Sequence, residues 1–557
     1  MTRVLLYLWL VNLGLAWAHI NGFGDHPLSQ IAIHRATLAL HDSAFIKAYP
    51  SVLGLKGEDT QWVTVDIEYP EPLVTDWIGV FSPAKFNSSY CPPVDDQDEQ
   101  KPYICSAPIK PKLVAVSNFI SFENPKAPVY PRLAQGKSWN EMTITWTSGY
   151  NVNEAVPFVE WGLKGKNRLR SPARTSTFDR SSMCGSPAKK VGWRDPGFIH
   201  TSFLKDLLPN SVYTYRMSHR LSDGSYVWTK FYSFKSSPYP GQDSLQRVII
   251  FGDMGKAERD GSNGYSNYQP GSLNTTDQLI KDLKNYDIVF HIGDLSYANG
   301  YLSQWDQFTS QVEPIASTVP YMVASGNHER DWPNSGSFFD GTDSGGECGV
   351  VAETMYYVPA ENRSKFWYST DYGMFHFCIA DSENDWREGT EQYSFIEKCL
   401  ASVDRQKQPW LIFVAHRVLG YSSDFWYAFD GSFEESMGRE SLQGLWQKYK
   451  VDMAIYGHAH NYERTCPIHQ DQCTNTEKSR YSGTVNGTIH VVVGGGGSHL
   501  SEFSEETPDW SIYRDYDFGF VKLTAFSHSS LLFEYKKSSD GKVYDSFTIS
   551  RDSKDMP

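Results

Sequence analysis

Five short blocks of the sequence contain residue types that bind metal ions. In chain order they are Gly252-Asp253-Met254-Gly255, Gly293-Asp294-Leu295-Ser296-Tyr297, Gly326-Asn327-His328-Glu329, Val414-Ala415-His416 and Gly457-His458-Ala459-His460. Together they supply two aspartates, one tyrosine, one asparagine and three histidines as candidate ligands. A carboxylate between two metal ions, with nitrogen and oxygen donors around it, is the ligand set of a two-metal phosphate-ester hydrolase. The tyrosine favours a hard trivalent ion such as Fe(III), because a phenolate is a hard anionic donor.

Each block follows a run of apolar residues. Continuous apolar runs predict strands that are buried on both faces; here they are Arg247–Phe251, Asp287–Ile292, Val319–Ser325, Trp410–Val414 and Asp452–Tyr456. A helix is expected at Asn274–Lys284. Further strands are expected at Thr488–Val493, Phe518–Phe526, Ser530–Lys536 and Val543–Ser550. Since ligands of α/β sheets bind beyond the carboxyl ends of the strands, we expect the seven side chains to meet at one sheet edge.

Taken singly, each block has a simpler explanation. Gly-Asp-x-Gly is a common turn that favours positive backbone angles, and Asn327-His328 fits an ordinary polar loop. Two isolated histidines are more often surface residues than ligands. Five such blocks in one order, each after a buried strand, are hard to obtain by chance. The joint pattern therefore predicts a metal centre.

The chain divides into four segments. Residues 1–18 have the positive charge, the apolar run and the Ala16-Trp17-Ala18 cleavage site of a secretory signal peptide. Residues 19–125 predict a small N-terminal β domain, with strands near Gln61–Tyr69 and Trp77–Phe81. Residues 126–240 begin in a proline-rich linker and continue as short alternating strands, which are typical of a fibronectin- or immunoglobulin-like sandwich. Residues 245–557 contain all five blocks and the C-terminal strands.

Charge and hydropathy limit the partners. The 557 residues carry a formal net charge of -14, which argues against a nucleic acid bound through a broad basic face. A phosphorylated small molecule or a nucleotide is compatible with that charge, because bound cations reverse the local sign. After the signal peptide no apolar run is long enough to span a bilayer, and the C-terminal residues are polar, so no membrane anchor is expected. The oligomeric state does not follow from the sequence.

Secretion predicts two covalent modifications. Glycosylation sequons begin at Asn87, Asn274, Asn362 and Asn486, so a glycoprotein is expected. The eight cysteines would meet an oxidising compartment, which permits disulfides. The spacing suggests local bridges for Cys91 with Cys105 and for Cys466 with Cys473. Cys378 and Cys399 could pair across a strand and a helix, which leaves Cys184 and Cys348; a buried free thiol at Cys378 is the alternative, and the sequence does not settle the connectivity.

The five blocks resemble the seven-ligand signature of the purple acid phosphatases, within the wider metallophosphoesterases. The tyrosine of the second block separates this family from most related phosphoesterases. Pro131-Arg132-Leu133-Ala134 and Glu141–Tyr150 are similar to the start of the large plant-type members. The extra N-terminal domain and Gly457–Arg464 resemble the branch of plant nucleotide pyrophosphatase/phosphodiesterases. The implied fold is multidomain, with all-β sandwich domains before an α/β metallophosphoesterase domain of α/β/β/α layers, and the implied location is extracellular, in the apoplast or cell wall.

The resemblance also implies a role for each ligand. Asp253, Tyr297 and His460 would bind Fe(III); Asn327, His416 and His458 would bind a divalent ion, Zn, Mn or Fe; and Asp294 would bridge the two ions. This division gives the harder ion the anionic oxygens and the softer ion the imidazoles and the amide. The metal pair would activate hydroxide for in-line attack on phosphate monoesters at acid pH.

Three residues are expected at the substrate: Asn327, His328 and Arg417. His328 matches the family's substrate-contacting histidine and would contact phosphate and protonate the leaving group, with a structural role as the alternative. Arg417 would contact a second phosphate or form an ordinary surface salt bridge. One departure from the family is clear. Simpler plant members have a His-His pair where this chain reads Ser423-Asp424-Phe425-Trp426-Tyr427, whose aromatics could stack on a nucleobase or pack in the core.

Three functions are consistent with these residues. The first is a secreted acid phosphatase, a metal-dependent phosphoric ester hydrolase. The second is a nucleotide pyrophosphatase/phosphodiesterase that uses the same site, motivated by the changed histidine region and its aromatics. The third is a catalytically silent, phosphate-binding cell-wall protein; the presence of all seven ligands argues against it.

Overall fold

The computed structural model describes residues 44–55, 61–72, 76, 78, 114, 115, 117, 120–259, 269, 271–425 and 433–552. The signal peptide, Asn87, Cys91, Cys105, Trp426 and Tyr427 lie outside these residues, as does most of the strand expected at Trp77–Phe81. The chain forms two compact units, Met1–Pro125 and Lys126–Pro557. Among the described residues, no helix combines the length and the apolar character needed to cross a membrane.

The first unit contains two small sheets. β1 (Phe45–Tyr49) pairs antiparallel with β3 (Thr64–Glu68), and β3 coincides with the strand expected near Gln61–Tyr69. β2 (Val52–Leu53) pairs with β4 (Ser121–Phe122) in parallel.

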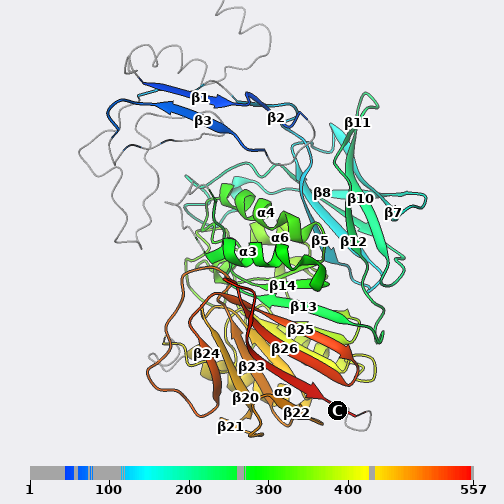
Figure 1. Ribbon diagram of the computed structural model, residues 1–557, viewed down its shortest axis with the longest axis vertical. Helices are drawn as coiled ribbons and strands as arrows, with labels where there is room; N and C mark the ends of the chain where they lie inside the picture. Colours follow the sequence, from blue (N-terminus) through cyan, green and yellow to red (C-terminus); the bar gives the residue numbers. More distant parts are fainter. Residues whose placement is uncertain are drawn as a thin grey trace, which may run out of the picture. The chain divides into compact units, whose positions relative to one another are not determined.

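The second unit begins with a β-sandwich, in cyan to green in Figure 1. Its strand order is β11-β10-β7-β8-β9-β6-β5, and β12 also pairs with β10. The bounds are β5 Val129–Gln135, β6 Met142–Ser148, β7 Ala155–Leu163, β8 Leu169–Ser176, β9 Phe198–Leu204, β10 Val212–Leu221, β11 Tyr226–Trp228 and β12 Tyr232–Lys235, with a 3-10 turn η1 at Arg180–Ser182. β5 starts inside the stretch expected to be a linker. Pro131 is compatible with that strand because β5 is the last strand of the sheet, and an edge strand does not need every ladder donor.

Two further sheets form the centre of the α/β part (Figure 1). The first has the order β15-β14-β13-β25-β26-β27-β22. Its bounds are β13 Gln246–Phe251, β14 Ile288–Ile292, β15 Tyr321–Ala324, β22 Arg480–Ser482, β25 Gly519–Ser527, β26 Ser530–Lys537 and β27 Val543–Ser550. β13, β14 and β15 run parallel, whereas β25 joins β13 antiparallel and extends the sheet with the C-terminal strands.

The second sheet has the order β16-β17-β18-β19-β23-β20-β21, and β24 pairs with β20. Its bounds are β16 Tyr368–Tyr372, β17 Phe375–Ile379, β18 Trp410–Ala415, β19 Met453–Tyr456, β20 Tyr462–His469, β21 Gln472–Cys473, β23 Thr488–Val493 and β24 Ser511–Asp515. β17, β18, β19 and β23 are parallel. β23 has the bounds that the sequence predicts.

The two sheets pack against each other through one hydrophobic core. Val248 and Phe290 of the first sheet share this core with Phe377, Val414 and Val493 of the second. The rings of Phe290 and Phe377 lie 4.4 Å apart, centroid to centroid. Burial of both faces explains why these strands are continuous apolar runs in the sequence.

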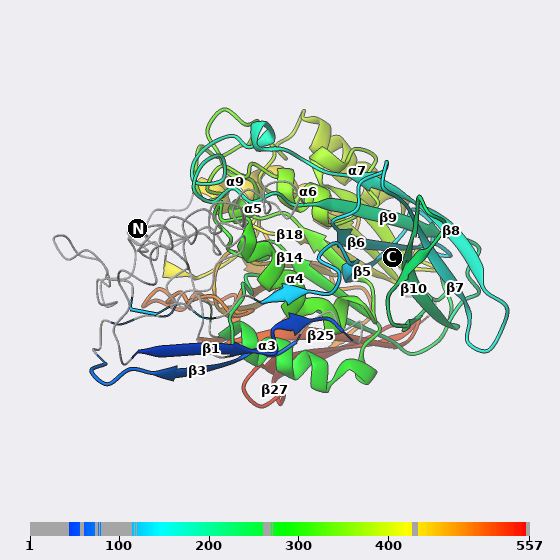
Figure 2. The same ribbon diagram turned by 90° about the horizontal axis from the view of Figure 1, so that it is seen from above.

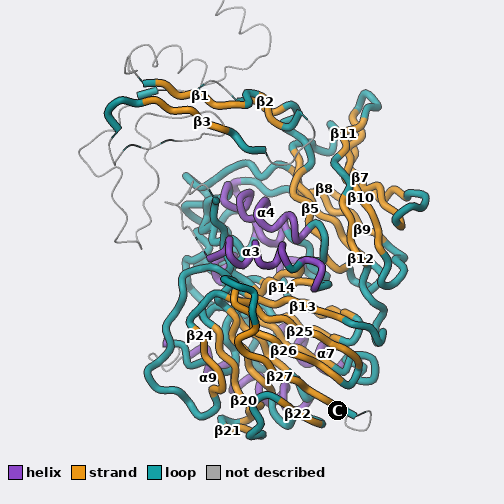
Figure 3. Tube along the Cα trace, in the orientation of Figure 1, coloured by secondary structure: helices purple, strands orange, loops and turns teal. Residues whose placement is uncertain are grey.

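Helices cover the outer faces of both sheets, as the view from above in Figure 2 and the purple helices in Figure 3 show. α3 (Gly271–Lys281) and α4 (Ser303–Ala316) contribute to the core of the first sheet. α7 (Glu391–Ser402) and α9 (Phe433–Lys448) pack on the second. The short elements are α5 Asn327–Arg330, α6 Val350–Met355, η2 Leu283–Asn285 and η3 Arg363–Lys365. The expected α/β/β/α layering, preceded by all-β domains, is confirmed.

Three disulfides join the described cysteines. Cys466 bonds to Cys473, and Cys378 bonds to Cys399, so two of the suggested pairings are confirmed. The free-thiol alternative for Cys378 is therefore wrong. Cys184 of the sandwich bonds to Cys348 of the α/β part, across 164 residues of sequence. Asn274, Asn362 and Asn486 are all exposed to solvent.

Candidate metal centre

The seven predicted ligands follow the carboxyl ends of five parallel strands. Asp253 follows β13, Asp294 and Tyr297 follow β14, and Asn327 follows β15, all in the first sheet. His416 follows β18, and His458 and His460 follow β19, in the second sheet. The expectation of one sheet edge is therefore wrong in one respect, because two stacked sheets share the ligands. The ends of both sheets converge, and the seven side chains meet there.

Several ligands have an unusual backbone conformation. Asp253, Asp294, Tyr297 and His458 have φ angles of 61°, 50°, 49° and 66°. The left-handed region is uncommon for residues with a side chain and is concentrated at functional sites. Each of these turns lies just beyond the carboxyl end of its strand, where the chain changes direction.

One group of donors consists of Asp253, Tyr297 and His460. The Tyr297 hydroxyl lies 3.2 Å from Asp253 Oδ1 and 2.9 Å from His460 Nε2. His460 Nε2 and Asp253 Oδ1 are 3.2 Å apart. All three side chains are buried. Three donor atoms thus face one point.

A second group consists of Asn327, His416 and His458. Asn327 Oδ1 lies 3.0 Å from His416 Nε2 and 3.0 Å from His458 Nδ1. The rings of the two histidines are 5.2 Å apart and nearly perpendicular, at 73°. One oxygen and two imidazole nitrogens converge here.

Asp294 belongs to both groups. Two sets of three residues have candidate ligand atoms within 4.8 Å of one another, and Asp294 is a member of both. The other members are Asp253 and His460 in one set and His416 and His458 in the other. Asp294 Oδ1 lies 3.3 Å from His416 Nε2. The geometry places this carboxylate where a bridge between two ions would lie.

Hydrogen bonds fix which ring nitrogen faces the centre. His416 Nδ1–H donates to the carbonyl of Ile292 at 3.0 Å, and His460 Nδ1–H donates to the carbonyl of His499 at 2.6 Å. Both rings therefore present Nε2 to the centre, as metal-binding histidines with a carbonyl partner do. Asn327 Nδ2 donates to Asp343 Oδ2 at 2.9 Å, which turns Asn327 Oδ1 inward.

Glu329 connects two of the ligand loops. Its carboxylate accepts three backbone N–H groups: Asp294 N at 2.8 Å, Leu295 N at 2.8 Å and Gly326 N at 3.0 Å. The side chain is fully buried. Glu329 thereby holds the loop after β14 against the turn after β15. The sequence contained one signal for this role, since a glutamate three residues after Gly326 is in the position of a capping box.

The Gly494–Gly497 loop after β23 also borders the centre. A Cβ on Gly494 would lie 2.2 Å from the carbonyl oxygen of Ala459 and 2.9 Å from Asp253 Oδ2, and a Cβ on Gly496 would lie 2.2 Å from the carbonyl oxygen of Gly252. The next residue, Ser498, donates its N–H to the Asp253 carbonyl at 3.0 Å. The glycines are needed because this loop crosses the backbone of two ligand turns.

The electrostatics indicate an excess of buried negative charge. Burial and the carboxylates of Asp253 and Asp294 raise the pKa of Tyr297 well above its ordinary value. Burial opposes protonation of His416, but Asp294 and Asp253 raise its pKa to about 10. Burial alone would raise the pKa of Asp294, yet His416 and His328 hold it well below the ordinary range. Cations between these groups would relieve the repulsion and the desolvation.

The donor set fits two metal ions. Ligand atoms about 2.1 Å from an ion lie roughly 3.0–3.4 Å apart in octahedral or tetrahedral arrangements. The distances of 2.9–3.3 Å within the two groups match that spacing. The group with the phenol and a carboxylate suits a hard ion, and the group with two imidazoles and an amide suits a softer one. Ligation by these residues stays a prediction that this geometry supports.

His328 lies at the mouth of the centre. Its ring packs on Tyr297 with centroids 4.4 Å apart, and its Nδ1 is 2.7 Å from Asn299 Oδ1. Nε2 lies 3.9 Å from Asp294 Oδ2. Asn299 was not singled out in the sequence, although it lies only two residues after Tyr297. The ring is thus held beside the bridging carboxylate.

Arg417 is not a surface residue. It is 6% exposed, and it donates from Nε to Glu383 at 2.8 Å and from an NH2 nitrogen to Asp331 at 2.9 Å. A further guanidinium nitrogen lies 3.3 Å from His458 Nε2, and the guanidinium stacks on Phe339 at 3.9 Å. The salt bridge expected as the alternative role of Arg417 is present, with Glu383 and Asp331, but it is buried and not at the surface. Contact with a phosphate stays a prediction.

The region that departs from the family's His-His pair is occupied by structural polar groups. Ser423 donates its hydroxyl to Glu463 at 2.5 Å. Asp424 accepts from Asn461 at 2.8 Å and from Ser501 at 2.5 Å. Both residues are buried. Phe425 is 45% exposed, so it does not pack in the core.

Sequence models of four known domains match this chain. They are described as the Fn3-like domain from Purple Acid Phosphatase (residues 46–118), the Purple acid Phosphatase N-terminal domain (128–236), Calcineurin-like phosphoesterase (246–462) and Iron/zinc purple acid phosphatase-like protein C (487–546). The third spans all five motif blocks.

Curated relatives and a solved structure agree with these matches. "Probable inactive purple acid phosphatase 27" of Arabidopsis thaliana is 67% identical over 99% of this chain and 97% of that protein. "Nucleotide pyrophosphatase/phosphodiesterase" of Hordeum vulgare is 74% identical over 60% of this chain and 91% of that protein. The structure of purple acid phosphatase PPD1 from yellow lupin (Lupinus luteus) seeds superimposes with a TM-score of 0.88 at 64% identity, over 93% of this chain and 97% of that one. The chain therefore belongs to the purple acid phosphatase family of binuclear metal-dependent phosphoesterases.

Proposed function

We propose that this chain hydrolyses phosphate esters at a two-metal centre built from its seven converging side chains. The observation that carries the proposal is the position of Asp294, whose carboxylate lies within reach of both donor groups. A bridging carboxylate between two clustered sets of donors is the arrangement that a two-metal hydrolase requires.

The donor chemistry assigns the ions. Fe(III) would be held by Asp253, Tyr297 and His460, and Zn, Mn or Fe(II) by Asn327, His416 and His458, with Asp294 shared. When bound, such a pair supplies positive charge for phosphate oxygens and a hydroxide at acid pH. The protein's own contribution is to fix the donor atoms before the substrate arrives, through the carbonyls of Ile292 and His499 and through Asp343.

His328 is the residue we assign to direct contact with the substrate. Asn299 orients its ring, and Tyr297 supports the ring from one side, so Nε2 stays next to Asp294. A phosphate seated at the centre would meet this edge of the ring. Arg417 adds positive charge beside His458, while its ion pairs with Glu383 and Asp331 keep it in place.

The primary substrates are phosphate monoesters at acid pH, and one observation favours diesters and nucleotide pyrophosphates as a second candidate. Where simpler members have a His-His pair, Ser423 and Asp424 are buried and already hydrogen-bonded. The leaving-group side therefore differs from that of a simple monoesterase, and Phe425 is exposed next to it. A relative that is 74% identical is named for nucleotide pyrophosphatase/phosphodiesterase activity.

A catalytically silent phosphate-binding protein is the competing function. Relatives with 67% and 65% identity are named probable inactive purple acid phosphatases. The converged ligand set of this chain argues for catalysis instead. Secretion to the apoplast or cell wall, with glycans on the exposed Asn274, Asn362 and Asn486, is part of the same proposal.

The test combines metal quantification, a visible spectrum and hydrolysis assays on the purified protein. We expect two bound ions, a charge-transfer band that disappears in Tyr297→Phe, and turnover of p-nitrophenyl phosphate. Asp294→Asn should lower turnover by roughly 100-fold or more together with metal content, whereas the control Asp540→Asn, in the turn after β26, should bind metal and turn over substrate like wild type.

The outcomes separate the candidate functions. Turnover of ATP and bis(p-nitrophenyl) phosphate that exceeds turnover of the monoester would favour the second candidate. A protein with both ions bound that hydrolyses none of these compounds would establish the silent alternative. A protein that binds neither ion at micromolar metal would overturn the metal centre itself.

A further inference from the structure

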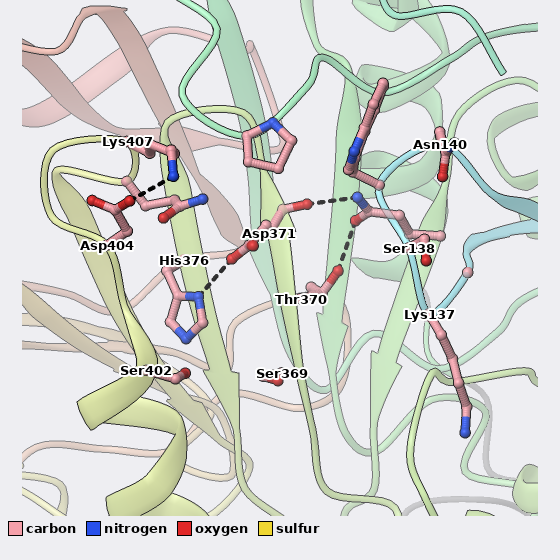
Figure 4. A pocket seen from close by; sticks show the side chains of 15 residues that line it. Lys137, Ser138, Asn140, Ser369, Thr370, Asp371, His376, Ser402, Asp404 and Lys407 are labelled. Atoms are coloured by element: carbon pink, nitrogen blue, oxygen red, sulfur yellow. Dashed lines mark hydrogen bonds and ion pairs between the residues drawn. The ribbon is translucent and has the colours of Figure 1, made fainter. Parts of the chain in front are cut away.

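A cavity of about 540 Å³ lies apart from the metal ligands, between the sandwich and the second sheet of the α/β part. Its walls come from the turn between β5 and β6, from β16 and β17, and from the segment after α7. Figure 4 shows Ser138 and Asn140 on one side and Asp404 and Lys407 on the other, with Asp371 and His376 between them. The volume falls in the range of small-ligand sites.

The walls of this cavity are held in place without a ligand. Gln135 donates its amide to the carbonyl of Asp371 at 2.6 Å and accepts from the Thr370 hydroxyl at 2.9 Å. The linker after the sandwich adds a backbone bond from Gly241 to Gly373 at 2.8 Å. A cavity that is preformed in this way does not require a ligand to order it, which favours binding.

One side chain in the cavity offers its polar atoms to whatever fills it. Gln408 lines the cavity and is 4% exposed as a residue; its backbone N–H donates to the Asp404 carbonyl at 2.6 Å, and its side-chain amide makes no hydrogen bond with a described residue. The amide is therefore in contact with the cavity solvent, and a ligand that exchanges hydrogen bonds with it would replace that water. The half-buried Asn140 has an amide in the same state on the opposite wall.

The charged side chains of the cavity wall have partners. Lys407 forms an ion pair with Asp404 at 2.7 Å, and Asp371 Oδ1 lies within hydrogen-bond distance of His376 Nδ1, at 2.6 Å. Lys137 alone adds an exposed cation at the rim. No cluster of positive charge is available for a phosphate or a uronate, and no cluster of negative charge is available for a metal ion. The ligand should therefore be neutral and rich in hydroxyl groups.

The remaining lining completes this chemistry. Trp139 and Pro240 offer flat apolar surfaces, and Ser138, Ser369 and Ser402 offer hydroxyls. Ring faces that pack on apolar C–H groups, beside amides and hydroxyls that exchange hydrogen bonds, match one ligand class. We propose that this cavity binds a neutral saccharide. The site is independent of the metal centre and of its proposed activity.

The sugar could come from a free oligosaccharide or from an N-linked glycan of a glycoprotein. Both present the same pyranose faces and hydroxyls. Cellotetraose represents the first source and mannotetraose the second. Trigalacturonate, which has the same ring size and carries negative charge, tests the charge argument.

The experiment is a calorimetric or ligand-observed NMR titration of the enzymatically deglycosylated full-length protein with each of the three oligosaccharides. We expect one of the neutral probes to bind with a Kd of about 1 mM or tighter. Gln408→Leu should weaken that binding at least tenfold, and Trp139→Ala should do the same. The control Gln472→Leu, on an exposed strand remote from the lining, should bind like wild type.

Each outcome decides the proposal. Binding of cellotetraose assigns a free polysaccharide, and binding of mannotetraose assigns a glycan; either supports the site when both cavity variants lose it. The proposal is overturned if neither neutral probe binds at about 10 mM, if trigalacturonate binds as well as they do, or if Gln408→Leu binds like wild type. Circular dichroism and p-nitrophenyl phosphate turnover establish that each variant is folded.

Discussion

At the scale of single residues, the centre depends on side chains that would not themselves touch a metal ion. Glu329 is the clearest case, because one carboxylate collects the N–H groups of Asp294, Leu295 and Gly326. A carboxylate accepts at both oxygens, whereas an amide presents one oxygen and one NH2 group. Glutamine at this position would direct an NH2 group at a backbone N–H and leave that donor buried without a partner.

We therefore predict that Glu329→Gln loosens both ligand loops. The free energy of unfolding should fall by about 1–3 kcal/mol, the cost of a buried unsatisfied group. Metal affinity, measured by competition with a chelator, should fall about 10- to 100-fold, as for other groups that orient ligands. The exposed Glu361→Gln serves as the control. Unchanged metal affinity in Glu329→Gln would contradict the role assigned to this carboxylate.

At the scale of elements, the strand ends that carry the ligands were readable from the sequence. β13, β14, β15, β18 and β19 are buried on both faces, so each appears as an apolar run that stops at a polar turn residue. The candidate ligands Asp253, Asp294 and His458 each lie two residues after those ends. Local sequence was sufficient to place them because the apolar run that predicts each strand and the polar turn residue are adjacent in the chain.

Other features depend on contacts that are distant in sequence. The apolar runs in the sequence do not indicate that β13 and β18 belong to different sheets. That division depends on contacts between the sheets, such as Phe290 of β14 against Phe377 of β17. The partners that orient ligands were also missed. Asp343 accepts a hydrogen bond from the Asn327 side chain, and Ser501 accepts one from the His460 backbone N–H. Both residues lie on separate loops, and no sequence motif marks either position.

The sandwich contains an element-scale source of pH dependence. His200 on β9 and His219 on β10 lie in its interior, with ring centroids 4.8 Å apart. Burial, with the neighbouring His219 as a second cause, lowers the pKa of His200 to about 3, and burial lowers the pKa of His219 to about 4. The Trp146 indole N–H donates to His219 Nε2 at 3.1 Å, which holds that nitrogen unprotonated.

We predict that these histidines destabilise the fold in acid. Unfolded histidine titrates near pH 6.5, so between about pH 6.5 and 4 the unfolded chain binds more protons than the folded one. The stabilisation that comes from keeping these histidines unprotonated is present in full above about pH 6.5, and it is lost as the pH falls from about 6.5 to about 4. His219→Gln should make the decline of unfolding free energy shallower by up to about 1.4 kcal/mol per pH unit in urea titrations.

The matched control for that experiment is Ser218→Ala on the same strand. Ser218 is buried and donates its hydroxyl to the carbonyl of Val227 at 2.9 Å, but it does not titrate. Its loss should lower stability by a similar amount at every pH. If the profile of His219→Gln runs parallel to that of wild type, His219 does not supply the acid sensitivity.

At the scale of the whole second unit, the sandwich is a fixed part of the α/β body. Arg132 of β5 donates to the carbonyl of Met355 at 2.9 Å, and the Tyr215 hydroxyl donates to the carbonyl of Ser317 at 2.8 Å. Both side chains are buried. The backbone of Cys184 also donates to the carbonyl of Gly346 at 2.8 Å, next to the disulfide with Cys348. Since Glu347 accepts from Gly300 N at 2.8 Å, this junction continues into the loop that carries Tyr297 and Asn299.

Removal of the Cys184–Cys348 bond should therefore destabilise the sandwich and the ligand loops together. The bond closes 164 residues, and the loop-entropy relation gives roughly 5 kcal/mol for that length, against roughly 2–3 kcal/mol for the seven-residue separation of Cys466–Cys473. We predict that the double variant Cys184→Ala/Cys348→Ala melts at a clearly lower temperature than Cys466→Ala/Cys473→Ala, and that it loses bound metal in the same calorimetric transition as the sandwich. A variant that retains its ions to a separate, higher transition would show that the junction does not reach the metal centre.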